Sequence, residues 1–136
     1  MLNLTGRVIM ISGANRGIGL AVARRLLDGG AKLSLGVRDK MTATSQFGEA
    51  QNIILNRYDA RDVGSAQQWV ENTVSTFGKI DGLVNNAGIA GPAVSLMDSD
   101  ETQLAEMWAV NVKGPTRLTR LARPHLTTVS STHLTV

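Results

Sequence analysis

Residues 8–19 read V-I-M-I-S-G-A-N-R-G-I-G and join an apolar, strand-like run to the helix-like segment L-A-V-A-R-R-L-L at residues 20–27. Three glycines therefore stand where a strand gives way to a helix. The unpaired backbone N–H groups of a first helical turn and the positive end of the helix dipole meet at such a place. A diphosphate is stabilised there if missing side chains let the backbone approach it. The stretch predicts either a phosphate-binding loop or a plain tight turn.

Each glycine of this stretch has an expected role. Gly13 permits the sharp turn, Gly17 permits the close approach of the backbone to a ligand, and Gly19 permits close packing of the helix on the sheet. The spacing G-x-x-x-G-x-G differs from the common G-x-G-x-x-G. A P-loop is excluded because no G-K-[S/T] follows.

Outward from this loop, strand-like and helix-like segments alternate. The apolar runs predict strands at Arg7–Ser12, Leu33–Val37, Ile53–Tyr58, Ile80–Asn85 and Thr127–Ser131. Strands that alternate with helices pair in parallel through right-handed crossovers, with helices on both faces. The sequence therefore predicts an α/β fold: a doubly wound parallel sheet in strand order 3-2-1-4-5, forming one dinucleotide-binding Rossmann domain over residues 1–136.

Helical periodicity marks the segments between these strands. After Gly17, the residues Ile18, Val22 and Leu26 recur on one face, and Gly29-Gly30 stops the helix. Residues 63–77 form a second helix, whereas residues 39–52 are weakly patterned and hold at most one short helix. A long helix is expected from Asp98 to about His125, with Asp98 and Glu101 placed like a capping pair.

Composition narrows the class of protein. The 136 residues are 43% hydrophobic and 18% charged, which is ordinary for a folded domain. No apolar run is long enough to span a membrane, and the N-terminus lacks the pattern of a signal peptide. The chain contains no cysteine, which fits a cytoplasmic setting. His125 and His133 have no clustered carboxylates, so no metal site is expected.

The net charge of +3 arises from one part of the chain. Residues 1–106 hold 10 basic and 11 acidic side chains and sum to 10 − 11 = −1, whereas residues 107–136 contribute +4. A nucleic-acid surface would need stacking aromatics, and aromatic residues make up only 4% of the chain. We therefore expect a solvated helix face and no nucleic-acid partner.

The glycine loop and several later segments resemble the short-chain dehydrogenase/reductase family. L-T-G-R-V at residues 4–8 resembles the usual start of that family, and Asp59 in Y-D-A-R-D resembles its adenine-contacting acidic residue. N-N-A-G at 85–88 resembles the motif that supports the central sheet and lines the cofactor, and N-V-K-G at 111–114 carries the Asn of the catalytic tetrad. The match runs from residue 3 to about 125.

The resemblance implies NAD(P)-dependent hydride transfer between a nicotinamide and an alcohol or carbonyl substrate. It assigns the catalytic positions to Asn111 and Ser131. It assigns cofactor binding to Gly13, Asn15, Arg16, Gly17, Ile18, Gly19, Arg38, Asp59, Ala60, Asn86, Ala87 and Gly88.

The choice of cofactor depends on the end of the second strand. A free ribose 2′-hydroxyl favours a carboxylate there, whereas a 2′-phosphate favours cations. Val37 occupies the acidic position of the family, and Arg38 follows it, with Arg16 inside the glycine loop. Two guanidinium groups that converge on one phosphate favour NADP. Asp39 keeps NAD as an alternative, because its carboxylate can accept a hydrogen bond from a ribose.

Asn111 lies four residues before Pro115 in the expected long helix. Proline has no N–H, so the Asn111 carbonyl loses its usual donor. A carbonyl released in this way can bind a water, which is the proton-relay role that the resemblance assigns to this Asn. A kink that only bends the helix over the sheet is the alternative.

The remaining catalytic groups of the family are incomplete in this sequence. V-S-S at residues 129–131 resembles the end of strand five and makes Ser131 the candidate serine. The Tyr-x-x-x-Lys pattern is absent, and the only tyrosine, Tyr58, is expected to lie buried beside the adenine end. Trp69 and Trp108 are expected to pack among apolar neighbours.

Three functions remain open at this point. The chain is a truncated short-chain dehydrogenase/reductase, a half-length dinucleotide-binding module, or a non-catalytic interaction subunit. We favour the first as family membership and expect little activity from these 136 residues alone. The helix at 98–125 is expected to join copies of the chain into a homo-oligomer.

Overall fold

The computed structural model describes residues 3–48, 50–91, 96–98 and 100–126. Its sheet has four parallel strands: β1 (Val8–Ser12), β2 (Lys32–Val37), β3 (Ile53–Arg57) and β4 (Gly82–Val84). Their order is β3-β2-β1-β4, which confirms the predicted arrangement for these strands. The expected fifth strand, Thr127–Ser131, lies outside the described residues. Just before it, Leu126 forms a parallel bridge with Ile80.

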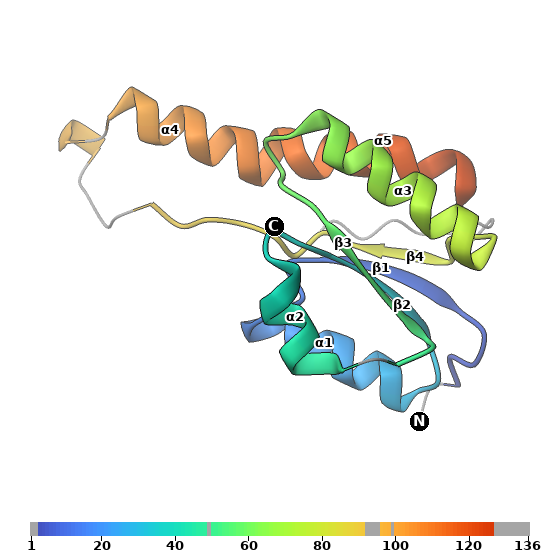
Figure 1. Cartoon of the computed structure of the whole chain (residues 1–136). Coiled ribbons are helices and arrows are strands. Elements are labelled where there is room, and N and C mark those ends of the chain that lie inside the picture. Colours follow the sequence, from blue (N-terminus) through green and yellow to red (C-terminus); the bar gives the residue numbers. More distant parts are fainter. Residues whose placement is uncertain (1–2, 49, 92–95, 99, 127–136) are drawn as a thin grey trace.

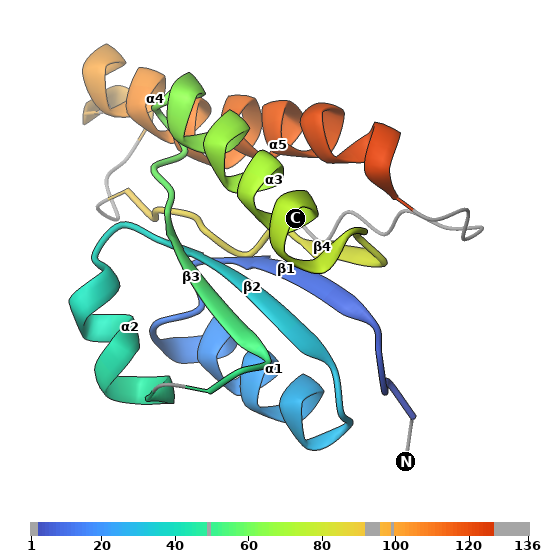
Figure 2. The ribbon, with the colours of Figure 1, turned by 45° about the vertical axis from the view of Figure 1, so that its right-hand side comes forward.

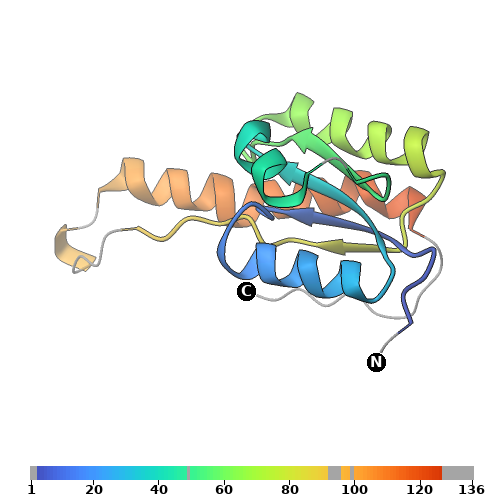
Figure 3. The same ribbon diagram turned by 60° about the horizontal axis from the view of Figure 1, so that its bottom comes forward.

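Helices cover both faces of the sheet (Figures 1 and 2). On one face lie α1 (Gly17–Asp28) and α2 (Lys40–Phe47), and on the other lie α3 (Val63–Phe77) and α5 (Gly114–Ala122). Helix α4 (Glu101–Trp108) projects beyond the sheet on the side toward which the strand arrows point (Figure 3). Within the described ranges, no helix combines the length and apolarity that crossing a lipid bilayer requires.

The expected long helix is divided into several segments. Asp98 closes a short 3₁₀ turn (Leu96–Asp98), so the predicted capping pair of Asp98 and Glu101 is wrong. The N-cap of α4 is Asp100, whose carboxylate accepts a 2.9 Å hydrogen bond from the Thr102 N–H. A second 3₁₀ turn follows α5 at Arg123–His125.

A π-helical turn, Ala109–Lys113, separates α4 from α5 directly before Pro115. The Gly114 N–H bonds to the Ala109 carbonyl five residues back, which is the wider spacing of a π turn. The missing N–H of Pro115 is compatible with this turn, because the backbone pairing of the helix shifts there. The interruption expected around Asn111 is therefore present, and a water on its carbonyl stays a prediction.

The core has two parts because successive side chains of a strand point to opposite faces of the sheet. Ile11 and Leu35 pack in the cluster beneath α1, while Met10 packs with Ile80 and Leu118 beneath α3 and α5. All five side chains are fully buried. Ile18 does not share the partly buried face of Val22 and Leu26, since this residue of the first α1 turn is 77% exposed.

Trp69 joins α3 to the middle of the sheet. Its indole lies so close to β2 that a Cβ on Gly36 would stand 2.5 Å from the ring. The indole Nε1 donates a 2.8 Å hydrogen bond to Ser34 Oγ, and the ring centroid lies 4.9 Å from that of Tyr58. The packing role predicted for Trp69 is confirmed. The same role for Trp108 is wrong, because that side chain is 58% exposed.

Replacing Gly36 by alanine tests this contact. The new methyl group would overlap the Trp69 ring, so the free energy of unfolding should fall by about 1–3 kcal/mol. Gly64→Ala is the matched control in α3, where a Cβ would meet nothing nearer than 3.4 Å. Helix propensity should leave that variant equal to or slightly more stable than the parent chain. Urea titration measures both, and equal losses would contradict the assignment.

Candidate functional site

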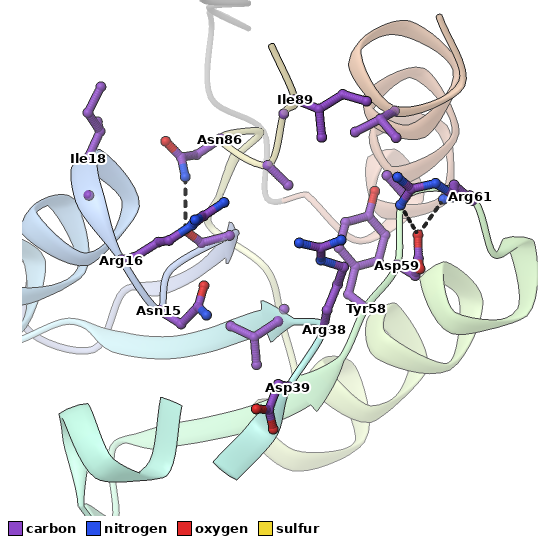
Figure 4. Close-up of a pocket in the computed structure, with 18 residues that line it drawn as sticks. Asn15, Arg16, Ile18, Arg38, Asp39, Tyr58, Asp59, Arg61, Asn86 and Ile89 are labelled. Carbon is purple, nitrogen blue, oxygen red and sulfur yellow. Dashed lines mark hydrogen bonds and ion pairs between the residues drawn. The ribbon is translucent and has the colours of Figure 1, made fainter. Parts of the chain in front are cut away.

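A pocket of about 480 Å³ opens where the four strands end (Figure 4). Its walls come from the end of β2 and from the segments that follow β1, β2, β3 and β4, with one residue from the π turn. The lining residues are Gly13, Asn15, Arg16, Gly17, Ile18, Gly36, Val37, Arg38, Asp39, Tyr58, Asp59, Ala60, Arg61, Asn86, Ala87, Gly88, Ile89 and Val110. Open α/β sheets bind their ligands in such a crevice at the carboxyl ends of the strands.

Eleven of the twelve residues predicted to bind the cofactor line this pocket. The exception is Gly19, which faces protein: a Cβ there would overlap the Gly13 carbonyl oxygen and Asn86 Nδ2. This geometry agrees with the packing role expected for that glycine. Gly13 and Gly17 have φ angles of 69° and 54°, in the left-handed region that favours glycine.

The N-terminus of α1 differs from those of the other helices that begin after a loop. Asp39, Asp62 and Asp100 cap α2, α3 and α4 with carboxylates that accept a main-chain N–H. The N-cap of α1 is Arg16, whose side chain makes no capping bond, and the first turn of α1 holds no acidic residue. The positive end of this helix therefore faces the pocket without a carboxylate of its own, as an anion-binding site requires.

A hydrogen-bond lattice holds the glycine loop against the segment after β4. Ser12 Oγ accepts the Asn86 N–H at 3.0 Å and the Ala87 N–H at 2.9 Å. In return, Asn86 Nδ2 donates to the carbonyl oxygens of Ser12 and Gly13 at 3.1 and 3.0 Å. The ends of β1 and β4 are thereby fixed on either side of the pocket floor.

The arginines that line the pocket differ in whether a carboxylate forms an ion pair with them. Arg61 is paired with Asp59 and with Glu106 of α4. In the described part of the chain, neither Arg16 nor Arg38 lies within ion-pair distance of a carboxylate. Asp39 also lines the pocket, but its two oxygens accept from the Met41 N–H at 3.0 Å and the Thr42 hydroxyl at 2.8 Å.

Two pKa shifts follow from these surroundings. Partial burial by itself would raise the pKa of Asp59, but hydrogen bonds from the Arg61 N–H and guanidinium outweigh it and lower the pKa. Burial raises the pKa of Tyr58 to about 12, so its phenol is protonated and uncharged at neutral pH. Tyr58 is 3% exposed and lies beside the pocket as expected.

Of the two predicted catalytic residues, the structure describes Asn111 but not Ser131. Asn111 Nδ2 donates to the Ile89 carbonyl at 2.8 Å, and Asn111 Oδ1 accepts the Ile89 N–H at 2.9 Å. Its side chain therefore anchors the loop at the pocket rim. Ser131 lies outside the described residues, as does His133. Among the residues that are described, no group of three or more His, Cys, Asp or Glu side chains gathers to hold a metal.

The pocket also contains seven residues beyond those predicted to bind the cofactor, although Tyr58 was expected beside the adenine end and Asp39 as the alternative ribose acceptor. Five of them adjoin a residue that was assigned to the cofactor, so proximity in sequence was an available signal. Gly36 lies within β2, and Val110, which precedes the catalytic candidate Asn111, reaches the pocket from the π turn. These seven residues are Gly36, Val37, Asp39, Tyr58, Arg61, Ile89 and Val110.

Removing the Ser12 hydroxyl tests the lattice. In Ser12→Ala the Asn86 and Ala87 N–H groups lose their acceptor, so the free energy of unfolding should fall by about 1–3 kcal/mol. Ser45→Ala is the control, because that exposed hydroxyl bonds only within α2 and its loss should cost under about 0.5 kcal/mol. Urea denaturation distinguishes the two, and a neutral Ser12→Ala would show that the lattice is dispensable.

The parallel sheet, the glycine-rich turn and the crevice together define a Rossmann-type, nucleotide-binding architecture. The family model described as short chain dehydrogenase matches residues 7–133. The chain belongs to the short-chain dehydrogenase/reductase family.

Individual relatives agree with this assignment. Agropine synthesis reductase of Rhizobium rhizogenes is 41% identical over 120 residues, which cover 88% of this chain and 28% of that protein. The 11-beta-hydroxysteroid dehydrogenase-like 2 protein of Arabidopsis thaliana is 35% identical over 132 residues, covering 91% and 42%. The chain therefore spans less than half the length of these two curated relatives.

Solved structures show the same likeness. The 3-ketoacyl-(acyl-carrier-protein) reductase of Brucella melitensis, crystallised with NADH, superposes with a TM-score of 0.85 at 35% identity. The match covers 90% of this chain and 51% of that one. A glucose/ribitol-type short-chain dehydrogenase/reductase from the same organism gives a TM-score of 0.84 at 29% identity, covering 92% and 54%.

Proposed function

We propose that this chain binds a nicotinamide dinucleotide and supplies the cofactor-binding part of an oxidoreductase acting on an alcohol or carbonyl. The observation that carries the proposal is the N-terminus of α1, which opens onto the pocket with neither a capping side chain nor an acidic residue. Reductases and dehydrogenases among the relatives, and a structural neighbour crystallised with NADH, support it.

The residues present fit such a cofactor. The N–H groups of the glycine loop would hold the pyrophosphate, and Asp59 and Ala60 would border the adenine. Asn86, Ala87 and Gly88 would line the path toward the nicotinamide, which when bound supplies or accepts a hydride. The Asn111 side chain, bonded to both main-chain polar groups of Ile89, would keep that path in shape.

Turnover is a separate matter from binding. The 136 residues include no Tyr-x-x-x-Lys pattern, and the one tyrosine, Tyr58, is a buried and weakly acidic phenol beside the adenine end. We therefore propose dinucleotide binding with little or no oxidoreduction by these residues alone. Calorimetric titration with the dinucleotide and a turnover assay with carbonyl compounds measure the two properties independently.

We propose NADP as the preferred cofactor, with NAD as the alternative. Arg16 and Arg38 line the pocket and form no ion pair with a carboxylate among the described residues, although Arg38 lies near enough to Asp59 to help lower its pKa. Both guanidinium groups therefore have donors to offer a 2′-phosphate. Asp39, which would favour a free ribose hydroxyl, already accepts two hydrogen bonds at the start of α2. These two observations support the phosphorylated cofactor.

The cofactor preference is tested by removing one cation. NADPH should bind the parent chain at least tenfold tighter than NADH, and Arg38→Gln should reduce that ratio severalfold because it weakens only the phosphate contact. Arg25→Gln, on an exposed turn at the far end of α1, should leave the ratio unchanged. Isothermal titration measures the ratio, and equal affinities in the parent chain would sink the assignment to NADP.

We also propose that two copies of the chain associate through the segment that contains α4. Leu104, Trp108 and Val112 recur at four-residue spacing and are 51%, 58% and 38% exposed. The segment is acidic at one end and basic at the other. Antiparallel pairing of two copies would place the exposed Asp98, Asp100 and Glu101 near the exposed Lys113, Arg120 and Arg123.

Trp108→Lys tests this association. A charge in the centre of the apolar stripe should weaken self-association at least tenfold, because large aromatic side chains dominate the energy of such contacts. Met41→Lys is the control, since that methionine is 82% exposed on α2, away from the stripe. Sedimentation velocity over a range of concentrations gives the result, and a parent chain that is monomeric throughout would contradict the proposal.

A further inference from the structure

The wall of the pocket at residues 59–61 is attached to the helices that follow β4. Arg117 of α5 donates a 3.1 Å hydrogen bond from its guanidinium to the Ala60 carbonyl. The backbone of α5 approaches the same residue so closely that a Cβ on Gly114 would stand 2.7 Å from Ala60 Cβ. The main chain at Ala60 is therefore held against α5.

The side chains of Asp59, Arg61 and Glu106 form a connected series of ion pairs. Arg61 donates from its main-chain N–H and from its guanidinium to the same Asp59 oxygen, Oδ1, at 3.0 and 3.1 Å (Figure 4). The other side of the guanidinium holds Glu106 of α4, with Nε at 2.6 Å from Oε1 and a second contact from Nη2. Glu106 thus fixes Arg61 from outside the pocket, and Arg61 fixes Asp59 at its edge.

This arrangement leaves the second Asp59 oxygen, Oδ2, without a hydrogen-bond donor in the described part of the chain. The Asp59 side chain is 25% exposed and the residue lines the pocket. The lowered pKa of Asp59 keeps it ionised at neutral pH, so that Oδ2 is an acceptor only.

We propose that Arg61, held by Glu106, is a positioning residue that turns the Asp59 carboxylate toward the exocyclic amine of the bound adenine. The inference rests on the proposed function, in which Asp59 contacts the adenine, and adds Arg61 and Glu106 as the residues that set the direction of that contact. A carboxylate oxygen accepts a hydrogen bond from the adenine amine. Hypoxanthine has a carbonyl oxygen at the same position, and this oxygen and the carboxylate repel each other. A site built around such a bond rejects the analogue that lacks the donor.

The experiment compares NADP with its hypoxanthine analogue by isothermal titration on the full chain. The parent chain should prefer the adenine dinucleotide roughly tenfold, as expected for one hydrogen bond to a charged group. Arg61→Met should bring the ratio of the two affinities, adenine over hypoxanthine dinucleotide, close to one. Arg61→Lys should restore part of this ratio. Glu106→Gln, a change at the surface of α4, should lower the ratio partway and keeps the test valid if Arg61→Met folds poorly.

Arg57→Met is the matched control. Arg57 forms a similar ion pair with Asp62 at 3.1 Å, near the start of α3, and does not line this pocket. Its loss should leave the ratio as it is in the parent chain. If Arg61 had only a structural role, Arg61→Met would weaken the binding of both nucleotides equally and leave the ratio of their affinities unchanged. That result overturns the inference.

The outcomes separate the inference from the proposed function. A parent chain that binds both nucleotides with equal affinity overturns the inference alone. A folded parent chain that binds neither nucleotide removes the proposed function, and the inference with it.

Discussion

The site depends on keeping the N-terminus of α1 open toward solvent at the place where β1 and β4 end. An uncapped helix start costs stability unless its N–H groups find acceptors. Ser12 and Asn86 do not supply those acceptors; they bond to each other and to Gly13, and so hold the loop that surrounds the helix start. Carboxylates cap α2, α3 and α4, whereas the start of α1 has no side-chain cap.

The helical segment from α4 to α5 links the pocket to the surface of the molecule. Its inner side supplies Val110 to the pocket and, through Arg117 and Glu106, holds the wall at residues 59–61. Its outer side carries the exposed stripe that contains Trp108. The π turn between these helices is the point at which Asn111 bonds to the loop after β4. One helical segment therefore contacts the pocket wall and, among the described residues, presents an exposed apolar surface.

Several predictions that depended on local backbone rules succeeded. Glycine spacing at a strand-to-helix junction predicted the turn at Gly13 and the close packing at Gly19, because backbone conformation and contact exclude other side chains there. The approach of a ligand to Gly17 stays a prediction. Predictions that depended on what a side chain touches failed more often. Trp108 is apolar and helical, and so is Trp69, yet only Trp69 has the sheet beneath it. Asp98 and Asp100 are both good capping residues, and the path of the chain before α4 selects Asp100.

By itself, the sequence determined the alternation of strands and helices, the parallel sheet order as far as β4, and most of the residues around the crevice. These properties follow from periodicity and from turns that span a few residues. Only the tertiary structure decided which carboxylates remain available to a ligand. Asp39 is engaged by α2, and Asp59 is held by an arginine that a helix 45 residues further along the chain keeps in place. Such pairings join segments far apart in the chain, and no local pattern encodes them.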